Sequence, residues 1–137
     1  MRIDLWTKGK EASLGEILDA REKRVWIQKE FLKNGAPSQV SFTLNIPGPV
    51  KVFPFTQWLF ELGDRLLVKA VEEEKGEVLD RRKNKANTGY EGFYSLSLPP
   101  GKVKEILTLA EEHHPLGRMF DFDVLDRQGR KISRQEL

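Results

Sequence analysis

Two aspartates near the C-terminal end of the sequence, Asp121 and Asp123, are the residues best suited to metal chemistry. They alternate with Phe120, Phe122 and Val124, which is typical of a strand with one apolar face. Both carboxylates then project from the other face with Cα atoms about 7 Å apart, where they repel each other unless water or a cation intervenes. Mg²⁺ binds one or two carboxylates together with substrate phosphates, so the pair predicts either a Mg²⁺ site for phosphoryl transfer or a solvated sheet face.

The residues just before this strand are candidates for holding a phosphate. Gly117 permits close approach of the backbone, and Arg118 offers a bidentate grip on phosphate or, alternatively, an ion pair with Asp121 or Asp123. His114 lies where the apolar stripe of the preceding helix would continue, and it either orients a phosphate or hydroxyl or caps the helix.

A second set of candidates lies on a predicted helix over residues 13–33, which begins with a capping-box pattern at Ser13. Arg21 and Gln28 fall within its apolar stripe, and Arg24 lies beside it. A charged group on an apolar stripe either extends its end to water or lines a cavity that holds an anion. The stripe itself consists of Leu14, Ile17, Leu18, Val25 and Leu32.

The turn after the first predicted strand holds Asn45, Gly48 and Lys51. Two prolines flank the glycine and stiffen the loop, which suits substrate positioning by Lys51 but equally suits a plain turn. The basic run over residues 81–85 indicates either a solvated hairpin or a surface that attracts an anionic substrate or an acidic partner.

The elements that must position these residues follow the order α-β-α-β-β-α-β-β. Hydrophobic periodicity and turn residues predict helices near residues 13–33, 54–75 and 102–113, and strands near 39–46, 77–84, 92–98, 119–125 and 130–133. The central β-α-β-β-α-β unit is the split βαβ arrangement. We therefore expect one α+β domain over residues 1–137, with an antiparallel ferredoxin-like sheet, two helices on one face, an extra N-terminal helix and a C-terminal β-hairpin.

Composition removes several classes of function. The chain has 137 residues and no cysteine, which excludes disulfides, thiolate metal sites and a cysteine nucleophile. Its two histidines are adjacent in sequence, which does not favour a histidine-rich metal site. The net charge of +2 is too small to indicate nucleic-acid binding by itself. No apolar run approaches the ~20 residues of a membrane span, so we expect a cytoplasmic protein with no membrane partner.

Two long segments resemble one enzyme family. Residues 41–51 (SFTLNIPGPVK) and 114–125 (HPLGRMFDFDVL), with the helix pattern Arg21-Glu22-x-Arg24-x-x-x-Gln28, are similar to apo-citrate lyase phosphoribosyl-dephospho-CoA transferases. The turn Thr88-Gly89-x-Glu91-Gly92 is similar as well, although Tyr90 stands where relatives often have proline. Relatives also continue past the position of Leu137, so we expect that a C-terminal tail is missing here.

The resemblance implies an activity. The family transfers the prosthetic group of 2'-(5''-triphosphoribosyl)-3'-dephospho-CoA to a serine of the citrate lyase acyl carrier subunit, with release of pyrophosphate. It implies that Asp121 and Asp123 hold Mg²⁺, that Arg118 and His114 act beside them, and that substrate contacts come from a wider set. That set is Arg21, Arg24, Gln28, Asn45, Gly48, Lys51 and Gly117.

Two other functions stay open at this point. The stretch from Arg118 to Asp123 is also similar to hydroxymethyl-dihydropterin pyrophosphokinases, which have a ferredoxin-like fold, so another Mg²⁺-dependent pyrophosphoryl or nucleotidyl transferase is one alternative. An RNA-binding β-α-β-β-α-β module is the other, because Phe93 and Tyr94 could offer exposed rings on the sheet. The aspartates would repel RNA there, and we expect no nucleic-acid partner.

Overall fold

A computed structural model gives the fold and describes residues 11–133. The helices are α2 (Leu14–Lys33), α3 (Thr56–Glu73) and α4 (Pro100–His113), with a short 3₁₀ turn, η1 (Gly117–Met119). The strands are β1 (Ser38–Leu44), β2 (Val78–Ala86), β3 (Gly89–Leu96) and β4 (Phe120–Leu125). None of the described helices combines the length and the apolar character needed to cross a bilayer.

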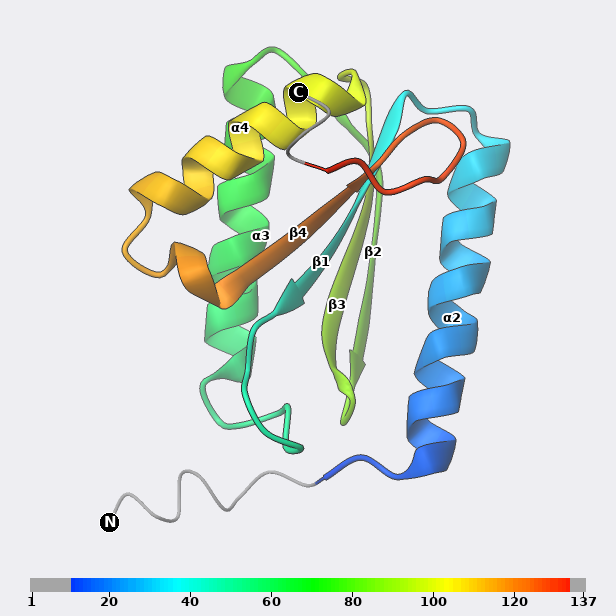
Figure 1. The fold of residues 1–137 in the computed structure, drawn as a ribbon, viewed down its shortest axis with the longest axis vertical. Helices are drawn as coiled ribbons and strands as arrows, with labels where there is room; N and C mark the ends of the chain where they lie inside the picture. The colour runs from blue at the N-terminus through cyan, green and yellow to red at the C-terminus, as the bar shows by residue number, and fades with distance from the viewer. Residues whose placement is uncertain (1–10, 134–137) are drawn as a thin grey trace.

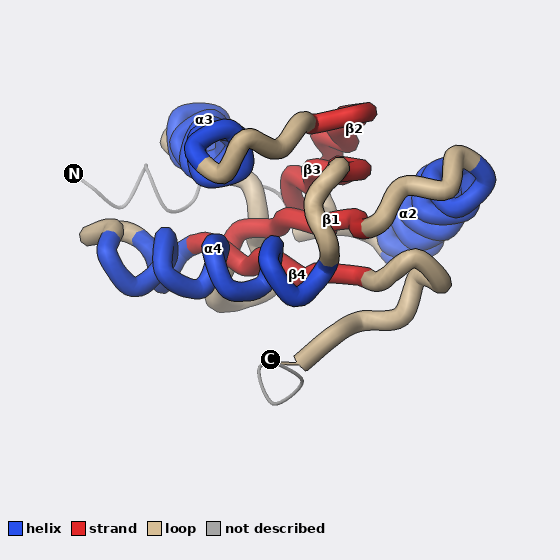
Figure 2. Tube along the Cα trace, turned by 90° about the horizontal axis from the view of Figure 1, so that it is seen from above, coloured by secondary structure: helices blue, strands red, loops and turns tan. Residues whose placement is uncertain are grey.

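The strands form one sheet in the order β2-β3-β1-β4, and all neighbours are antiparallel. Helices α3 and α4 cover one face, while α2 lies against the opposite face (Figures 1 and 2). The predicted α+β fold with an antiparallel sheet and two helices on one face is therefore confirmed.

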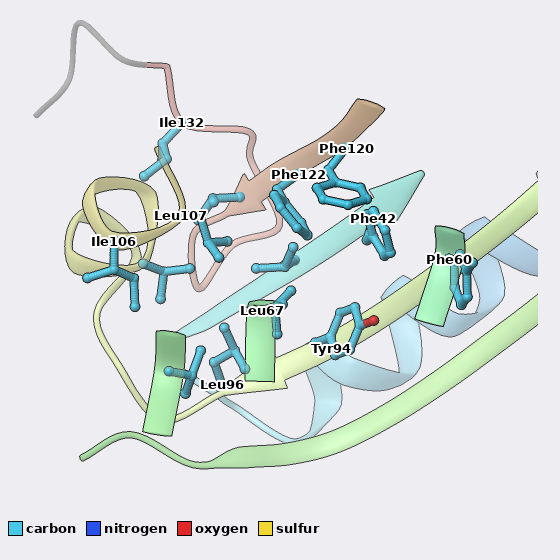
Figure 3. Close-up of a cluster of buried hydrophobic side chains, with 14 of the residues drawn as sticks. Phe42, Phe60, Leu67, Tyr94, Leu96, Ile106, Leu107, Phe120, Phe122 and Ile132 are labelled. Atoms are coloured by element: carbon cyan, nitrogen blue, oxygen red, sulfur yellow. The ribbon is translucent and has the colours of Figure 1, made fainter. Parts of the chain in front are cut away.

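The main core lies between the sheet and helices α3 and α4 (Figure 3). Phe42 of β1 is at its centre, stacked on Phe60 of α3 at 5.0 Å and on Phe122 of β4 at 4.8 Å between ring centroids. Because Phe120, Phe122 and Val124 are all buried here, the alternation predicted for β4 is confirmed.

Helix α2 begins as predicted but buries a different face. Ser13 and Glu16 form the capping box, yet the buried side chains are Ala20, Ile27 and Phe31. The apolar stripe predicted from helical spacing is not the buried face, since all five of its residues are exposed. The sheet presents Phe93 to this helix, and Ile27 and Phe31 pack on it as a second small core.

The predicted C-terminal hairpin is present only in part. Asp126 accepts hydrogen bonds from the backbone N–H groups of Gln128 and Arg130 and so forms the turn. The return segment makes one isolated bridge, Leu125 with Lys131, and forms no strand. The side chain of Ile132 packs into the main core, and the segment does not continue pairing along the edge of β4.

Candidate functional site

The two aspartates of β4 lie on the face of the sheet that α2 only partly covers. Asp121 is paired with Thr43 of β1 and Asp123 with Ser41, and both carboxylates are half-buried. Lys131 binds Asp123, with 2.9 Å between Nζ and Oδ1. The ion pair considered for Arg118 is therefore made by Lys131, a residue that the sequence did not single out.

Burial and a neighbouring carboxylate dominate the electrostatics of Asp121. Burial raises the pKa of Asp121 above its usual value, and the negative charge of Asp123 raises it further. Lys131, Lys104 and a hydrogen bond with Thr43 act in the opposite direction without cancelling the shift. A half-buried carboxylate pair of this kind fits a divalent cation that also binds substrate oxygens. Within residues 11–133 no third His, Asp or Glu joins the pair.

Arg24 of α2 is held by a buried carboxylate from the sheet. Its Nε and Nη2 atoms donate to Glu91 of β3 at 2.7 Å and 3.0 Å. The Glu91 side chain is 5% exposed, whereas that of Arg24 is 41% exposed. The hydrogen bonds to Glu91 raise the pKa of Arg24, which keeps the guanidinium charged at the edge of an open cavity.

That cavity gathers several of the predicted cations. Arg24, Thr43, Lys51 and the segment 88–91 line a space of about 120 Å³. Arg24, Lys51 and Thr88 also line a larger neighbouring space of about 620 Å³, together with Arg21. Lys51 donates to the carbonyl oxygen of Ile46 at 2.6 Å, which fixes its ammonium group at the mouth of the turn. Arg21, Arg24 and Lys51 are therefore brought together.

The predicted turn between the prolines lies beside these cations. Gly48 has a φ of 86°, a conformation that glycine adopts without strain. Pro49 lines the larger cavity, while Gly48 is itself exposed. Gln28 is half-buried on α2, one turn beyond Arg24, and lines neither cavity.

Two predicted residues join β1 to the segment before β4. The side-chain amide of Asn45 donates to the carbonyl oxygen of Arg118 at 3.0 Å. The backbone N–H of Asn45 donates to the carbonyl of Met119 at 2.8 Å. Asn45 thus positions the start of β4, and the Arg118 side chain is exposed there.

His114 and Gly117 lie away from the aspartates. The His114 ring packs edge-on against Phe120, 5.8 Å between centroids, on the helix-covered side of the sheet. Its Nδ1 accepts a hydrogen bond from the backbone of Leu116. Gly117 is buried, and a Cβ atom there would lie 1.8 Å from the carbonyl oxygen of Glu111. Close packing against α4 thus requires glycine at this position.

The RNA-binding alternative loses the feature that favoured it. Phe93 and Tyr94 are 1% and 0% exposed, so neither ring is available for stacking with a base. Phe93 faces α2, and the Tyr94 hydroxyl donates to Asp64 of α3 at 2.6 Å inside the main core. The suggestion of exposed aromatic residues on β3 is wrong.

Sequence reasoning missed Glu91 and Thr43 as site residues. Both could have been found from alternation, since Glu91 shares a strand face with Phe93 and Thr43 with Ser41. A carboxylate on a face that α2 covers requires a cation. Helix α2 supplies this cation through Arg24.

Comparisons with known proteins agree with the resemblance. Residues 12–137 match the family described as apo-citrate lyase phosphoribosyl-dephospho-CoA transferase. A Vibrio cholerae serotype O1 protein (strain M66-2) named "Probable apo-citrate lyase phosphoribosyl-dephospho-CoA transferase" is 35% identical over 124 residues, which is 90% of this chain and 70% of that protein. Proteins named apo-citrate lyase phosphoribosyl-dephospho-CoA transferase from Citrobacter koseri (strain ATCC BAA-895 / CDC 4225-83 / SGSC4696) and Escherichia coli O7:K1 (strain IAI39 / ExPEC) are each 32% identical. They cover 91% and 90% of this chain and 68% of their own length.

Proposed function

The chain belongs to the apo-citrate lyase phosphoribosyl-dephospho-CoA transferase family, and from this premise we propose that it attaches the phosphoribosyl-dephospho-CoA group to apo-citrate lyase. The observation that carries the proposal is the match over most of the chain. The convergence of Arg21, Arg24 and Lys51 at one cavity supports it, because the substrate is a polyanion.

The reaction needs little covalent chemistry from this chain. In the proposed step, the hydroxyl oxygen of a serine on the acyl carrier subunit attacks the α-phosphorus of 2'-(5''-triphosphoribosyl)-3'-dephospho-CoA. The bond from that phosphorus to the bridging oxygen breaks, pyrophosphate leaves, and the serine proton passes to a base. A phosphodiester remains on the carrier. The protein's task is to position both substrates and to offset the charge of the triphosphate.

We assign Asp121 and Asp123 to hold Mg²⁺, which would offset charge on the triphosphate when bound. Their half-buried position and the raised pKa of Asp121 support this role. Arg21, Arg24 and Lys51 are assigned to the other phosphates of the substrate. Direct roles of the other residues stay predictions, namely catalysis for Arg118 and His114 and substrate binding for Gln28, Asn45, Gly48 and Gly117.

The proposal includes two further assignments, a fold topology and a location in the cell. The strand order and the β-α-β-β-α-β succession support a ferredoxin-like fold for the unit from β1 to β4. A cytoplasmic location fits a chain without cysteine.

A transfer assay tests the function directly. The protein is incubated with the triphosphoribosyl precursor, Mg²⁺ and the apo carrier subunit, and intact mass is measured. We expect the carrier to gain the mass of the prosthetic group with release of pyrophosphate, and no gain with EDTA. Absence of any mass gain with Mg²⁺ present contradicts the proposal.

Substitution of the aspartates tests the metal assignment. Asp121→Asn and Asp123→Asn are each expected to lower transfer by at least about a hundredfold, because each removes a ligand charge. Asp19→Asn, on the exposed side of α2, is the matched control and should transfer normally. Full activity in either β4 variant would remove the metal role of that residue.

A further inference from the structure

The first half of α2 carries apolar side chains that the fold leaves uncovered within residues 11–133. Leu14, Ile17 and Leu18 are 72%, 49% and 48% exposed. Their spacing of three and four residues places them side by side on one strip of the helix. A contiguous apolar strip on a surface marks a contact with a ligand or partner more often than isolated apolar residues do.

This strip is one wall of the larger cavity. Leu14, Ile17 and Leu18 line it together with the cations Arg21, Arg24 and Lys51 and with one carboxylate, that of Glu11. Its volume of about 620 Å³ lies within the ~300–1,000 Å³ typical of small-molecule sites. The site thus combines an aliphatic wall with a charged part in which three cations outnumber one carboxylate.

The lining of the larger cavity, apolar on α2 and mostly cationic elsewhere, fits an amphiphilic anion. Three cations meet anionic oxygens, and the apolar side chains meet a saturated carbon chain. The described residues around this cavity include no aromatic ring, so the wall favours an aliphatic group over a stacked base.

We propose that this cavity is the subsite for the dephospho-CoA body of the substrate. Its diphosphate lies against Arg21, Arg24 and Lys51, and its pantetheine arm lies along Leu14, Ile17 and Leu18. The inference rests on the proposed function and deepens it, because it places a part of the substrate that does not react.

The position relative to the aspartates agrees with this assignment. Arg24 and Lys51 line both cavities. Thr43 lines the smaller one and is paired with Asp121 across β1 and β4. A long substrate can therefore hold its triphosphate at Asp121 and Asp123 while its apolar arm lies on α2.

Binding of two soluble probes tests the subsite without any transfer. Dephospho-CoA and ADP-ribose both carry adenosine and a diphosphate diester of equal charge, but only the former has the pantetheine arm. Titration calorimetry on the full chain is expected to show about tenfold tighter binding of dephospho-CoA, from burial of the arm. Equal affinities for the two probes would overturn the proposal.

Variants on the helix locate the effect. Leu18→Ser should remove most of the preference for dephospho-CoA and leave binding of ADP-ribose unchanged, whereas Arg21→Gln should weaken both probes. Leu109→Ser on α4, at 47% exposure, is matched to Leu18 and should change neither. Ile17→Ser is the second variant should Leu18→Ser lower the melting temperature.

The two proposals fail separately. A preference for dephospho-CoA that Leu18→Ser leaves intact overturns the subsite on α2, whatever the transfer assay shows. A wild-type chain that prefers dephospho-CoA through Leu18 but never modifies the carrier overturns the proposed function and leaves the subsite standing.

Discussion

The pairing of Arg24 with Glu91 shows how one residue serves both the fold and the site. The carboxylate is almost fully buried and the guanidinium is about half exposed. The cost of taking Glu91 out of water is offset only while Arg24 is present. Arg24 is thus a poor choice for testing substrate binding alone, and Arg21, which is exposed, is a better one.

This asymmetry predicts unequal effects of removing the two partners. Arg24→Gln leaves a buried carboxylate unpaired and is expected to lower the free energy of unfolding by about 3 kcal/mol. Glu91→Gln leaves a guanidinium that can reach water and should cost about 1 kcal/mol. Urea denaturation of both variants and of the double variant measures the difference.

The double variant gives the decisive comparison. Its loss should be smaller than the sum of the two single losses, because no charge is left buried. Lys23→Gln, which breaks an exposed pair with Asp19, is the control and should change stability by less than about 0.5 kcal/mol. Equal losses for Arg24→Gln and Glu91→Gln would contradict this account.

At the scale of the elements, sequence patterns predicted strands better than helix faces. The alternation in β4 was sufficient to predict its buried face, because a strand has only two faces and the alternating apolar residues all lie on one of them. Helix α2 could bury either of two faces, since both its leucine stripe and the face of Ile27 and Phe31 are apolar. The sheet decided between them through Phe93, which no local pattern of α2 could show.

The same limit explains the candidate site. The strand face of Asp121 and Asp123 followed from local alternation. The meeting of Arg24, Lys51 and Glu91 depends on how α2 crosses the sheet and how the turn after β1 folds back, which are long-range packing effects. The prediction for His114 used helical spacing alone. Helix α4 ends before Pro115, and the His114 ring packs on Phe120 rather than on the sheet face that carries the aspartates.

The junction between α4 and β4 yields a prediction for Gly117. Gly117→Ala would place a Cβ atom against the backbone carbonyl of Glu111, which cannot rotate away. The variant should lose about 1–3 kcal/mol of stability. Gly101→Ala, in the first turn of α4 and with no heavy atom within 4 Å of the new Cβ, should be neutral or slightly stabilising. Similar melting temperatures for the two variants would show that the close approach is not limiting.

Over the whole molecule, the net charge is only +2, and local groups of charge matter more than the total. Arg21, Arg24 and Lys51 lie at the cavities on the α2 side of the sheet. Exposed acids at the end of α3, at residues 72–74, and Glu105 on α4 lie on the other side, where the exposed cations Lys69 and Lys75 accompany them. The three cations therefore place positive charge locally where the proposed polyanionic substrate binds.

This distribution predicts a salt dependence confined to substrate binding. Raising salt from ~0.05 to ~0.3 M shortens the range of electrostatic attraction, so KM for the triphosphoribosyl precursor should rise severalfold while kcat changes little. Arg21→Gln should flatten this slope, because it removes one cation of the cavity. Lys69→Gln, an exposed cation on α3, is the control and should keep the wild-type slope. Steady-state kinetics at several salt concentrations provide the measurement. A constant KM would contradict electrostatic attraction of the substrate. Equal flattening of the slope by Arg21→Gln and Lys69→Gln would show that the attraction comes from net charge rather than from the cavity.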